Sequence, residues 1–432
     1  MSATKPISTT TAFQVFQVMR LGSAVLTGVV LAKSGLGLTD IGIYEMLLYV
    51  GTTLSFFWVS GFLQGIGSLY VKSEEILQKS FVFQVFFIFI AISLLLSLVL
   101  WFGQSWILPL LTGQKSIPYF GLFAIYLGFN LPTFPVEIIY LIKNKAITML
   151  WWGIFIFGLH LCAVALPLWV GWGLQGSLFA LIVLAVLKFL WTMRVMFQWG
   201  NPILDFGHMQ QYLVFCLPLM AGTLVGNLML FWDNWLVNWY YHDVQNFAIF
   251  RFGAREFPLA LALCTGLGTA LVPVLSQSLV MGMGELKAKG LRLMHLLFPL
   301  AIVLMLVSKP LFPLVFNSDF AKSAPIFNIF LIITATRVLL PGSIVLALGQ
   351  TQSIFWISIL ELGIRIALSL AFIPYFGLEG VAWAVVLSFW IEKIGLIWIL
   401  ESRHQVKKSD WLAIPWYLFY TTLLLATVWH CN

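Results

Sequence analysis

The chain has 432 residues, of which 61% are hydrophobic and only 9% are charged, with a formal net charge of +7. Soluble domains carry about 25% charged residues, so this composition excludes a water-soluble enzyme, a disordered chain and a nucleic-acid-binding protein. We therefore predict an integral membrane protein, in which the excess of basic residues belongs to cytoplasmic loops.

Long apolar runs follow one another along almost the whole chain. Twelve of them are long enough for a spanning helix, which needs roughly 20 apolar residues. They cover residues 12–33, 41–71, 80–111, 117–142, 146–170, 174–199, 209–239, 244–281, 290–316, 322–348, 351–374 and 378–400. A last run, 411–429, is either a thirteenth crossing or an interfacial helix, and we favour a crossing. Because the runs do not alternate polar with apolar residues, barrel strands are excluded and the predicted fold is all-α.

Basic residues near the ends of the runs give the orientation. With the N-terminus inside, twelve lysines and arginines lie at inner ends, and only four lie at outer ends, namely Lys33, Lys115, Lys309 and Lys322. Positively charged loops stay in the cytoplasm, so we predict a multi-pass protein of the cytoplasmic membrane with a cytoplasmic N-terminus.

Three pairs of segments recur at nearly the same offset and indicate an internal duplication. GLQGSLFA at 173–180 matches GLEGVAWA at 377–384, an offset of 204 (377 − 173), and LIKNKAITMLWW at 141–152 parallels LALGQTQSIFWI at 346–357. DIGIY around Asp40 parallels DVQNF around Asp243. An even number of helices between copies preserves direction, so the pattern predicts two parallel six-helix halves with substrate held between them near the midplane. The expected divisions are 1–200 and 201–402 for the two lobes, and 403–432 for a cytoplasmic linker and the extra helix.

Several charged residues fall inside the apolar runs, where a charge costs roughly 2.5–3.5 kcal/mol at the bilayer centre. They are Arg20, Glu137, Lys188, Asp233, Arg251, Arg255, Glu256, Arg337, Glu361, Arg365, Glu392 and Lys393. Residues at this depth face a wet cavity or a partner, so this set contains the candidates for a binding site.

Arg251 and Arg255 are four residues apart, which places both on one face of a continuous helix. Two guanidinium groups on one face favour an anionic ligand, because arginine presents a planar fork that matches phosphate oxygens. The alternative is that both reach an interface or pair with Glu137 or Asp233 on other helices. Arg20 and Arg337 complete the predicted substrate-binding set.

Glu361 and Arg365 are also four residues apart, and the simplest interpretation is an ion pair within one helix. Asp233 and Glu361 are the candidates for binding a coupling cation, although for Asp233 a location at the outer membrane interface is favoured. Lys188 is interpreted as a lysine that extends to the membrane surface.

No catalytic or nucleotide-binding motif occurs in the sequence, which lacks GxSxG, Walker A, HExxH and GxGxxG patterns. The four cysteines form no CxxC pair. We therefore predict a protein that is not an enzyme and that uses no cofactor, metal, nucleotide or nucleic acid.

The layout of two parallel six-helix halves resembles the MOP exporter superfamily, and Wzx-type polysaccharide flippases within it. The stretch FRFGAREFPLALALCTGLGTALVPVLSQS (250–278) looks like the eighth helix of that superfamily, and TDIGIYEMLLYV (39–50) resembles the start of the second helix of Wzx-type proteins. Lipid II flippases of the superfamily carry cavity arginines on helices one, two and eight. Arg20 corresponds to the first, and Arg251 and Arg255 flank the third with a displaced register, while residues 41–71 contain no arginine.

This resemblance implies export of an undecaprenyl-diphosphate-linked oligosaccharide by alternating access between two lobes. The implied partners are that lipid-linked substrate, the bilayer and other polysaccharide-assembly proteins of the membrane. Two alternatives stay open, a MATE-like cation-coupled antiporter of organic cations and a membrane-embedded polysaccharide polymerase or ligase.

Overall fold

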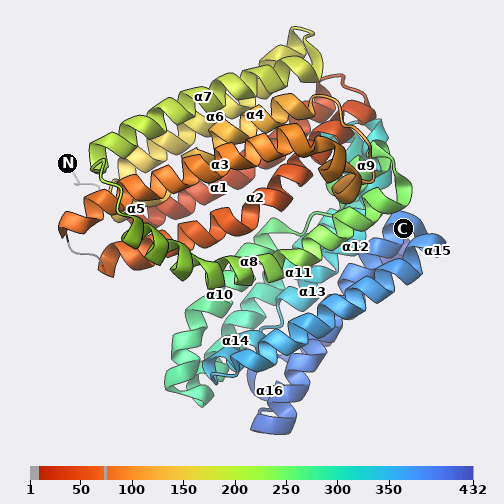
Figure 1. The fold of residues 1–432 in the computed structure, drawn as a ribbon. Helices are drawn as coiled ribbons and strands as arrows, with labels where there is room; N and C mark the ends of the chain where they lie inside the picture. Colours follow the sequence, from red (N-terminus) through yellow and green to blue (C-terminus); the bar gives the residue numbers. More distant parts are fainter. Residues whose placement is uncertain (1–8, 73–74, 432) are drawn as a thin grey trace, which may run out of the picture. The chain divides into compact units, whose positions relative to one another are not determined.

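The computed structural model describes residues 9–72 and 75–431, and no strand occurs among them. The chain divides into two compact units (Figure 1). The first comprises Met1–Phe231 and Asn238–Gln245, and the second comprises Trp232–Val237 and Asn246–Asn432. The predicted all-helical fold is therefore confirmed within the described residues.

The first unit is a bundle of long helices packed side by side. Its elements are α1 (Thr9–Lys33), α2 (Leu38–Lys72), α3 (Glu75–Thr112), α4 (Phe120–Asn130), η1 (Leu131–Thr133), α5 (Pro135–Ile142), α6 (Ala146–Trp169), α7 (Gly173–Trp199) and most of α8 (Phe206–Tyr241). Helix α6 packs between α1 and α7, and α4 packs between α7 and α3. Gly153 of α6 allows this close packing, because a Cβ there would stand 2.7 Å from the Phe16 ring of α1.

The second unit is built around α11. Its elements are α9 (Val244–Gly253), α10 (Pro258–Gln277), α11 (Leu279–Val315), η2 (Ser318–Lys322), α12 (Ser323–Leu331), α13 (Ile333–Arg337), α14 (Pro341–Ala347), α15 (Thr351–His404), α16 (Lys408–Trp411) and α17 (Ile414–Cys431). Helix α11 contacts α10, α12 and α17, while α14 contacts α10 and α15.

Many of these helices have the length and hydropathy of membrane spans. Among the described residues, ten helical segments are long and apolar enough to cross a membrane, or eleven if the bent α8 is one span. A multi-pass membrane protein is thereby confirmed, while the number of twelve or thirteen crossings stays a prediction. Helix α17, in the region of the predicted thirteenth crossing, is not among these segments.

The prediction of one continuous helix over 244–281 is wrong. Helix α9 ends at Gly253, residues 254–257 are not helical, and α10 begins at Pro258. Proline lacks the N–H needed to continue a helix and forces the preceding residue out of the helical region. Phe257 accordingly has φ −64° and ψ 107°.

Helix α15 contains both of the predicted runs 351–374 and 378–400, and it reverses direction between them. Gly377 has φ 59° and ψ −137°, outside the helical region. A Cβ on Gly380 would stand 2.6 Å from the carbonyl oxygen of Phe372, and Arg365 lies over the ring of Phe389 at 5.4 Å. Residues before and after Gly377 are thus neighbours, and α15 is a hairpin of two arms.

The two copies of the sequence repeat make the same turns. Gly173 and Gly377, the first residues of the GLQG and GLEG segments, have φ 62° and 59°. Asn144 and Gly349, which correspond at an offset of 205 (349 − 144), have φ 53° and 74°. Shared left-handed residues at matched positions support the duplication that the sequence indicates.

We expect Gly377→Ala to destabilise the second unit, because the backbone at this position is accessible almost only to glycine. The cost expected for such a strained residue is about 1–3 kcal/mol, and it should appear as a lower unfolding temperature in detergent. Gly363→Ala on the first arm is the control, since a Cβ there meets nothing within 4 Å. Equal unfolding temperatures for the two variants would contradict the assignment of strain to Gly377.

Candidate functional site

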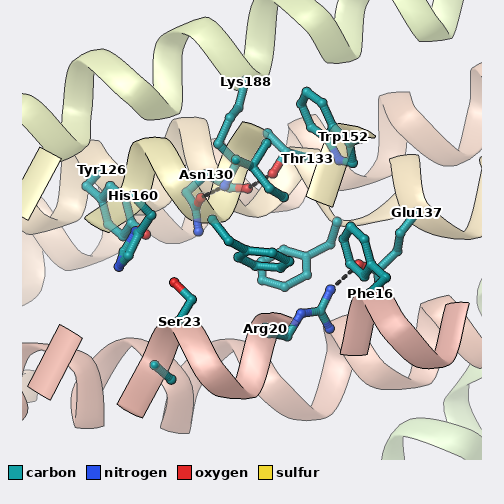
Figure 2. Close-up of a pocket in the computed structure, with 14 residues that line it drawn as sticks. Phe16, Arg20, Ser23, Tyr126, Asn130, Thr133, Glu137, Trp152, His160 and Lys188 are labelled. Carbon is teal, nitrogen blue, oxygen red and sulfur yellow. Dashed lines mark hydrogen bonds and ion pairs between the residues drawn. The ribbon is translucent and has the colours of Figure 1, made fainter. Parts of the chain in front are cut away.

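A cavity of about 220 Å³, here called the polar cavity because charged side chains reach it, lies in the first unit and is lined by side chains of α1, α4, η1, α5, α6 and α7. Figure 2 shows Arg20 and Ser23 of α1 facing Lys188, Asn130 and Thr133 across it. Its walls combine aromatic rings with charged groups, as is typical of ligand sites.

Arg20 forms an ion pair with Glu137 at one side of this cavity (Figure 2). The guanidinium also lies over the rings of Phe16 and Phe134, at 5.3 and 5.8 Å. Pro135 opens α5 and places Glu137 in its first turn, where the helix dipole favours a negative charge. Arg20, a predicted ligand residue, therefore lines a cavity but has a carboxylate partner there.

Lys188 extends into the same cavity, and its Nζ donates a hydrogen bond to Asn130 Oδ1 at 2.6 Å. Among the described residues it has no ion-pair partner. The described lining holds two cations, Arg20 and Lys188, and one carboxylate, Glu137. The cavity is thus left with one uncompensated positive charge, at Lys188.

The interpretation of Lys188 as a lysine that reaches the membrane surface is wrong. It lies eleven residues before the end of α7, so at 1.5 Å per residue roughly 16 Å of helix separates it from the nearer end. That depth could have been inferred from the sequence. The hydrogen-bond partner of Lys188 could not be inferred from the sequence, because Asn130 lies on another helix, at the end of α4 before η1.

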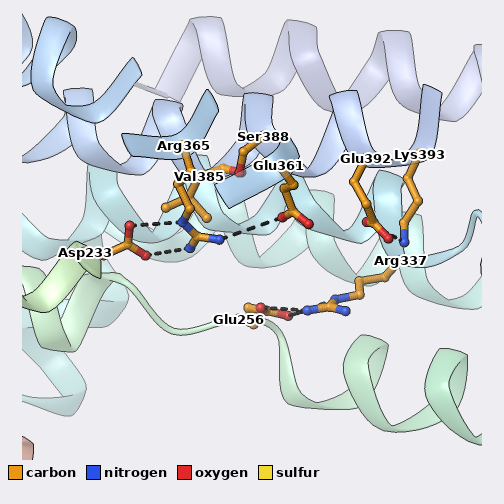
Figure 3. A network of polar contacts seen from close by, with 9 residues as sticks. All are labelled: Asp233, Glu256, Arg337, Glu361, Arg365, Val385, Ser388, Glu392 and Lys393. Atoms are coloured by element: carbon orange, nitrogen blue, oxygen red, sulfur yellow. Dashed lines mark hydrogen bonds and ion pairs between the residues drawn. The ribbon is translucent and has the colours of Figure 1, made fainter. Parts of the chain in front are cut away.

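The second unit contains a row of buried and half-buried charged side chains (Figure 3). Arg337 donates to both carboxylate oxygens of Glu256, with N–O distances of 2.7 to 3.0 Å. Glu392 pairs with Lys393 at 2.8 Å. Arg337, another predicted ligand residue, is therefore neutralised by a bidentate partner.

Arg365 binds Asp233 rather than Glu361. Its Nε and Nη2 donate to the two oxygens of Asp233 at 3.0 and 2.5 Å, and all three side chains are buried. Glu361 stands 4.0 Å from Arg365 Nη1, and its Oε1 is buried without a hydrogen-bond partner. The predicted ion pair within one helix is thus secondary, because Asp233 on α8 offers the fork geometry that Arg365 satisfies best.

Arg251 and Arg255 do not share a helix face. Arg251 lies in the last turn of α9, whereas Arg255 follows in the non-helical segment before Pro258. The Arg255 guanidinium lies over the Phe252 ring at 4.7 Å. The prediction failed because the spacing rule applies only to an unbroken helix. Arg20 belongs to the first unit, while Arg251, Arg255 and Arg337 belong to the second.

A sequence profile described as lipid II flippase MurJ matches residues 151–431, well over half of the chain. The chain belongs to the MurJ family. A comparison with curated proteins finds no match.

Solved structures of the MOP superfamily share the fold of this MurJ-family chain. The lipid II flippase MurJ in an inward closed conformation has a TM-score of 0.72 at 16% identity, covering 96% of this chain and 92% of its own. An inward-facing multidrug resistance MATE transporter has a TM-score of 0.62 at 14% identity, covering 95% and 98%. A MOP superfamily transporter from Pyrococcus furiosus has a TM-score of 0.56 at 14% identity, covering 98% and 97%.

These comparisons confirm membership of the MOP superfamily, which the sequence motifs had indicated. The MurJ family consists of transporters, so the prediction that this protein is not an enzyme is also confirmed. The narrower assignment to Wzx-type polysaccharide flippases concerns which substrate is moved, and it stays a prediction.

We expect Arg365→Leu to destabilise the protein strongly, because it leaves Asp233 and Glu361 buried together without their cation. Breaking a buried pair by removing one partner costs about 3–5 kcal/mol, measured here as a lower unfolding temperature in detergent. The double variant Asp233→Leu with Arg365→Leu should recover part of this loss.

Lys289→Met is the matched control, because it breaks the exposed pair of Lys289 with Glu285. Exposed pairs contribute about 0–1 kcal/mol, so its unfolding temperature should barely change. A similar effect of Arg365→Leu and Lys289→Met would rule out a structural role for the buried pair.

Proposed function

We propose that this protein moves an undecaprenyl-diphosphate-linked oligosaccharide across the cytoplasmic membrane by alternating access, with its N-terminus in the cytoplasm. The observation that carries the proposal is the polar cavity of the first unit, which has one more cation than carboxylate at the depth of an apolar helix bundle. An unpaired charge there is expensive, and an anionic headgroup compensates it.

The chemistry of the cavity suits a diphosphate. Lys188 supplies a compact charge with three donors, of which Asn130 occupies one. Arg20 presents a planar fork that matches phosphate oxygens, and an incoming diphosphate would compete with Glu137 for it. The aromatic rings of Phe16, Phe134 and Trp152 line the same space and offer flat surfaces for sugar rings.

Relatives in the family are described as lipid II flippases, and we propose a different saccharide on the same lipid carrier. Residues 41–71, which form most of α2, contain no arginine, although lipid II flippases carry a cavity arginine on the second helix. The contribution of Arg251 and Arg255 to headgroup binding stays a prediction. We also expect other polysaccharide-assembly proteins of the membrane to supply and receive this substrate.

We expect Lys188→Gln to lower the apparent affinity for a fluorescent undecaprenyl-diphosphate oligosaccharide about 10-fold in a proteoliposome flipping assay. Losing a charge-assisted hydrogen bond costs about 1.5–3 kcal/mol, and 1.4 kcal/mol corresponds to tenfold. The variant breaks no ion pair, so folding should be retained. Lys145→Gln is the control, because its ammonium lies over the Trp199 ring and not in the cavity.

Parallel assays separate the competing substrates. Faster flipping of lipid II than of the oligosaccharide would reject the proposed headgroup, while a MATE-like function would appear as export of an organic cation that the lipid-linked saccharide does not inhibit. A positively charged cavity disfavours that second outcome. Growth of the saccharide chain in the same vesicles would instead indicate a polymerase.

We further propose that Glu361 binds the coupling cation, and that this cation is a proton. Arg365 occupies both oxygens of Asp233, the other predicted candidate, whereas Glu361 Oε1 is buried and has no hydrogen-bond partner. The groups that face Glu361 are Arg365 on its own arm, Glu392 and Lys393 on the second arm, and Arg337. A proton satisfies a single buried carboxylate oxygen without further ligands.

We expect Glu361→Gln to make transport independent of an imposed proton gradient, because an amide mimics the permanently protonated acid. The measurement is the initial flipping rate in proteoliposomes with and without that gradient. Glu285→Gln is the control, since Glu285 forms only an exposed pair with Lys289. A variant that responds to the gradient as the unaltered protein does would exclude Glu361 from coupling.

A further inference from the structure

An apolar groove of about 580 Å³ runs along the outside of the first unit, between α6 and α7. On α6 its lining residues are Ile147, Thr148, Trp151, Trp152 and Phe155. Their spacing is that of one helix face. Ile147, Trp151 and Phe155 are each at least 60% exposed in the protein alone, so this face is open to the surrounding lipid.

The facing wall of the groove comes from α7, where Leu184, Leu187, Lys188 and Trp191 recur at helical spacing. Lys188 is the single charged residue in the described lining of the groove. Its hydrogen bond to Asn130 carries the ammonium toward the polar cavity. The groove is therefore apolar along its length and cationic at its inner boundary.

The groove and the polar cavity adjoin, because Trp152 and Lys188 line both. Trp152 stacks on Trp191 with ring centroids 5.8 Å apart and an interplanar angle of 17°. Trp191 is anchored in turn, because its Nε1 donates to the Tyr140 hydroxyl at 2.8 Å. A stacked tryptophan pair and one lysine thus form the boundary between a lipid-facing groove and a polar chamber.

The second copy of the repeat lacks both the stacked tryptophan pair and the unpaired lysine at the matched positions. Gly395 corresponds to Trp191 (395 − 191 = 204), and a Cβ there would stand 2.7 Å from Ile357, so the two arms pack in direct contact. Glu392 corresponds to Lys188 at the same offset, and it is paired with Lys393. The open groove with an unpaired cation therefore distinguishes the first copy from the second, and close packing of two helices does not require it.

We propose that this groove binds the first isoprene units of a polyprenyl chain whose anionic phosphate lies at Lys188, with the headgroup in the adjoining cavity. The inference rests on the proposed function and specifies where its lipid enters. An amphipathic ligand of this kind satisfies both surfaces at once, since its chain covers Trp151, Phe155 and Leu187 while its phosphate neutralises the lysine. The nine-residue stretch of α6 that lines the groove is roughly 13 Å long, somewhat less than half of the roughly 30 Å hydrocarbon core.

Photolabelling tests the location of the chain. Three probes carry a diazirine near the head end, namely a polyprenyl diphosphate, an uncharged polyprenol and a phosphatidylcholine, and each is added to the protein in proteoliposomes. Peptide mass spectrometry should place the diphosphate label on 147–155 and 184–191. Unlabelled polyprenyl diphosphate should reduce that label at least 10-fold, and Lys188→Gln should do the same. Labelling of the groove by phosphatidylcholine with equal efficiency would overturn the proposal, because the groove would then hold bulk lipid only.

A filled groove provides an independent test. Thr148→Trp with Leu187→Trp places bulk between the helices without touching the polar cavity, and it should abolish groove labelling and slow flipping at least 10-fold. Leu190→Trp is the matched control on α7, because Leu190 is 58% exposed and does not line the groove. Normal flipping by the filled variant overturns the groove as the chain's path and leaves the proposed function intact. Absence of flipping by the unaltered protein would instead reject the proposed function itself.

Discussion

The cost of placing a charge in the hydrocarbon interior governs which residues of this protein can have a function. Most of its deep charges are cancelled by a neighbour within the same compact unit, as Arg20 is by Glu137, Asp233 by Arg365 and Glu256 by Arg337. Such pairs lower a burial penalty that each partner alone would carry. Two groups lack a close ion-pair partner in the described residues. Lys188 in the first unit forms only a hydrogen bond, and Glu361 in the second stands 4.0 Å from Arg365, whose hydrogen bonds go to Asp233. Because a weakly compensated buried charge adds little to the stability of the fold, these two groups are the ones at which we propose that a ligand binds.

The duplication that the sequence indicates offers an explanation for two such different proposed sites in one chain. Both copies have residues of positive φ at matched positions, as expected of two copies of one backbone frame. The side chains on that common frame have diverged. Where the first copy has a pair of stacked tryptophans, the second has Ile357 packed on Gly395. The first copy therefore has an opening toward lipid, and the matched helices of the second are closed by direct contact.

Much of the fold was predictable, because apolar length is a direct physical requirement of crossing a bilayer. The predicted runs correspond to the observed helices in order, including the reversal between 351–374 and 378–400. The break at 254–257 was missed although Pro258 was visible, because proline is also tolerated within spanning helices as a kink, and several helices here do contain one. Sequence spacing alone does not distinguish a proline that kinks a helix from one that marks the end of one helix and the start of the next.

The pairing of charges was largely beyond the sequence. Residues four apart suggested Glu361 with Arg365, yet Arg365 prefers Asp233, which is 132 positions away along the chain. Partner choice depends on which helices are neighbours, and no local pattern contains that information. The same applies to Lys188, whose depth in α7 could be counted but whose position beside Asn130 depends on how α4 packs on α7. Local sequence rules identified the charged residues, and tertiary packing determined which of them form ion pairs with one another.

If the cavity binds an anion as proposed, its unpaired cation also gives the membrane potential a role in the transport cycle. An inside-negative potential contributes roughly 2.3 kcal/mol per elementary charge per 100 mV. With a diphosphate bound, the chamber around Lys188 and Arg20 carries net negative charge, which the potential drives outward. After release, the net charge of Arg20, Glu137 and Lys188 is positive again, and the same field draws the empty site back toward the cytoplasm. Had Lys188 a carboxylate partner as Glu392 has a lysine, the empty site would be neutral and the return step would lose this driving force. The single surplus charge would thus serve both steps, recognition of the headgroup and resetting of the carrier.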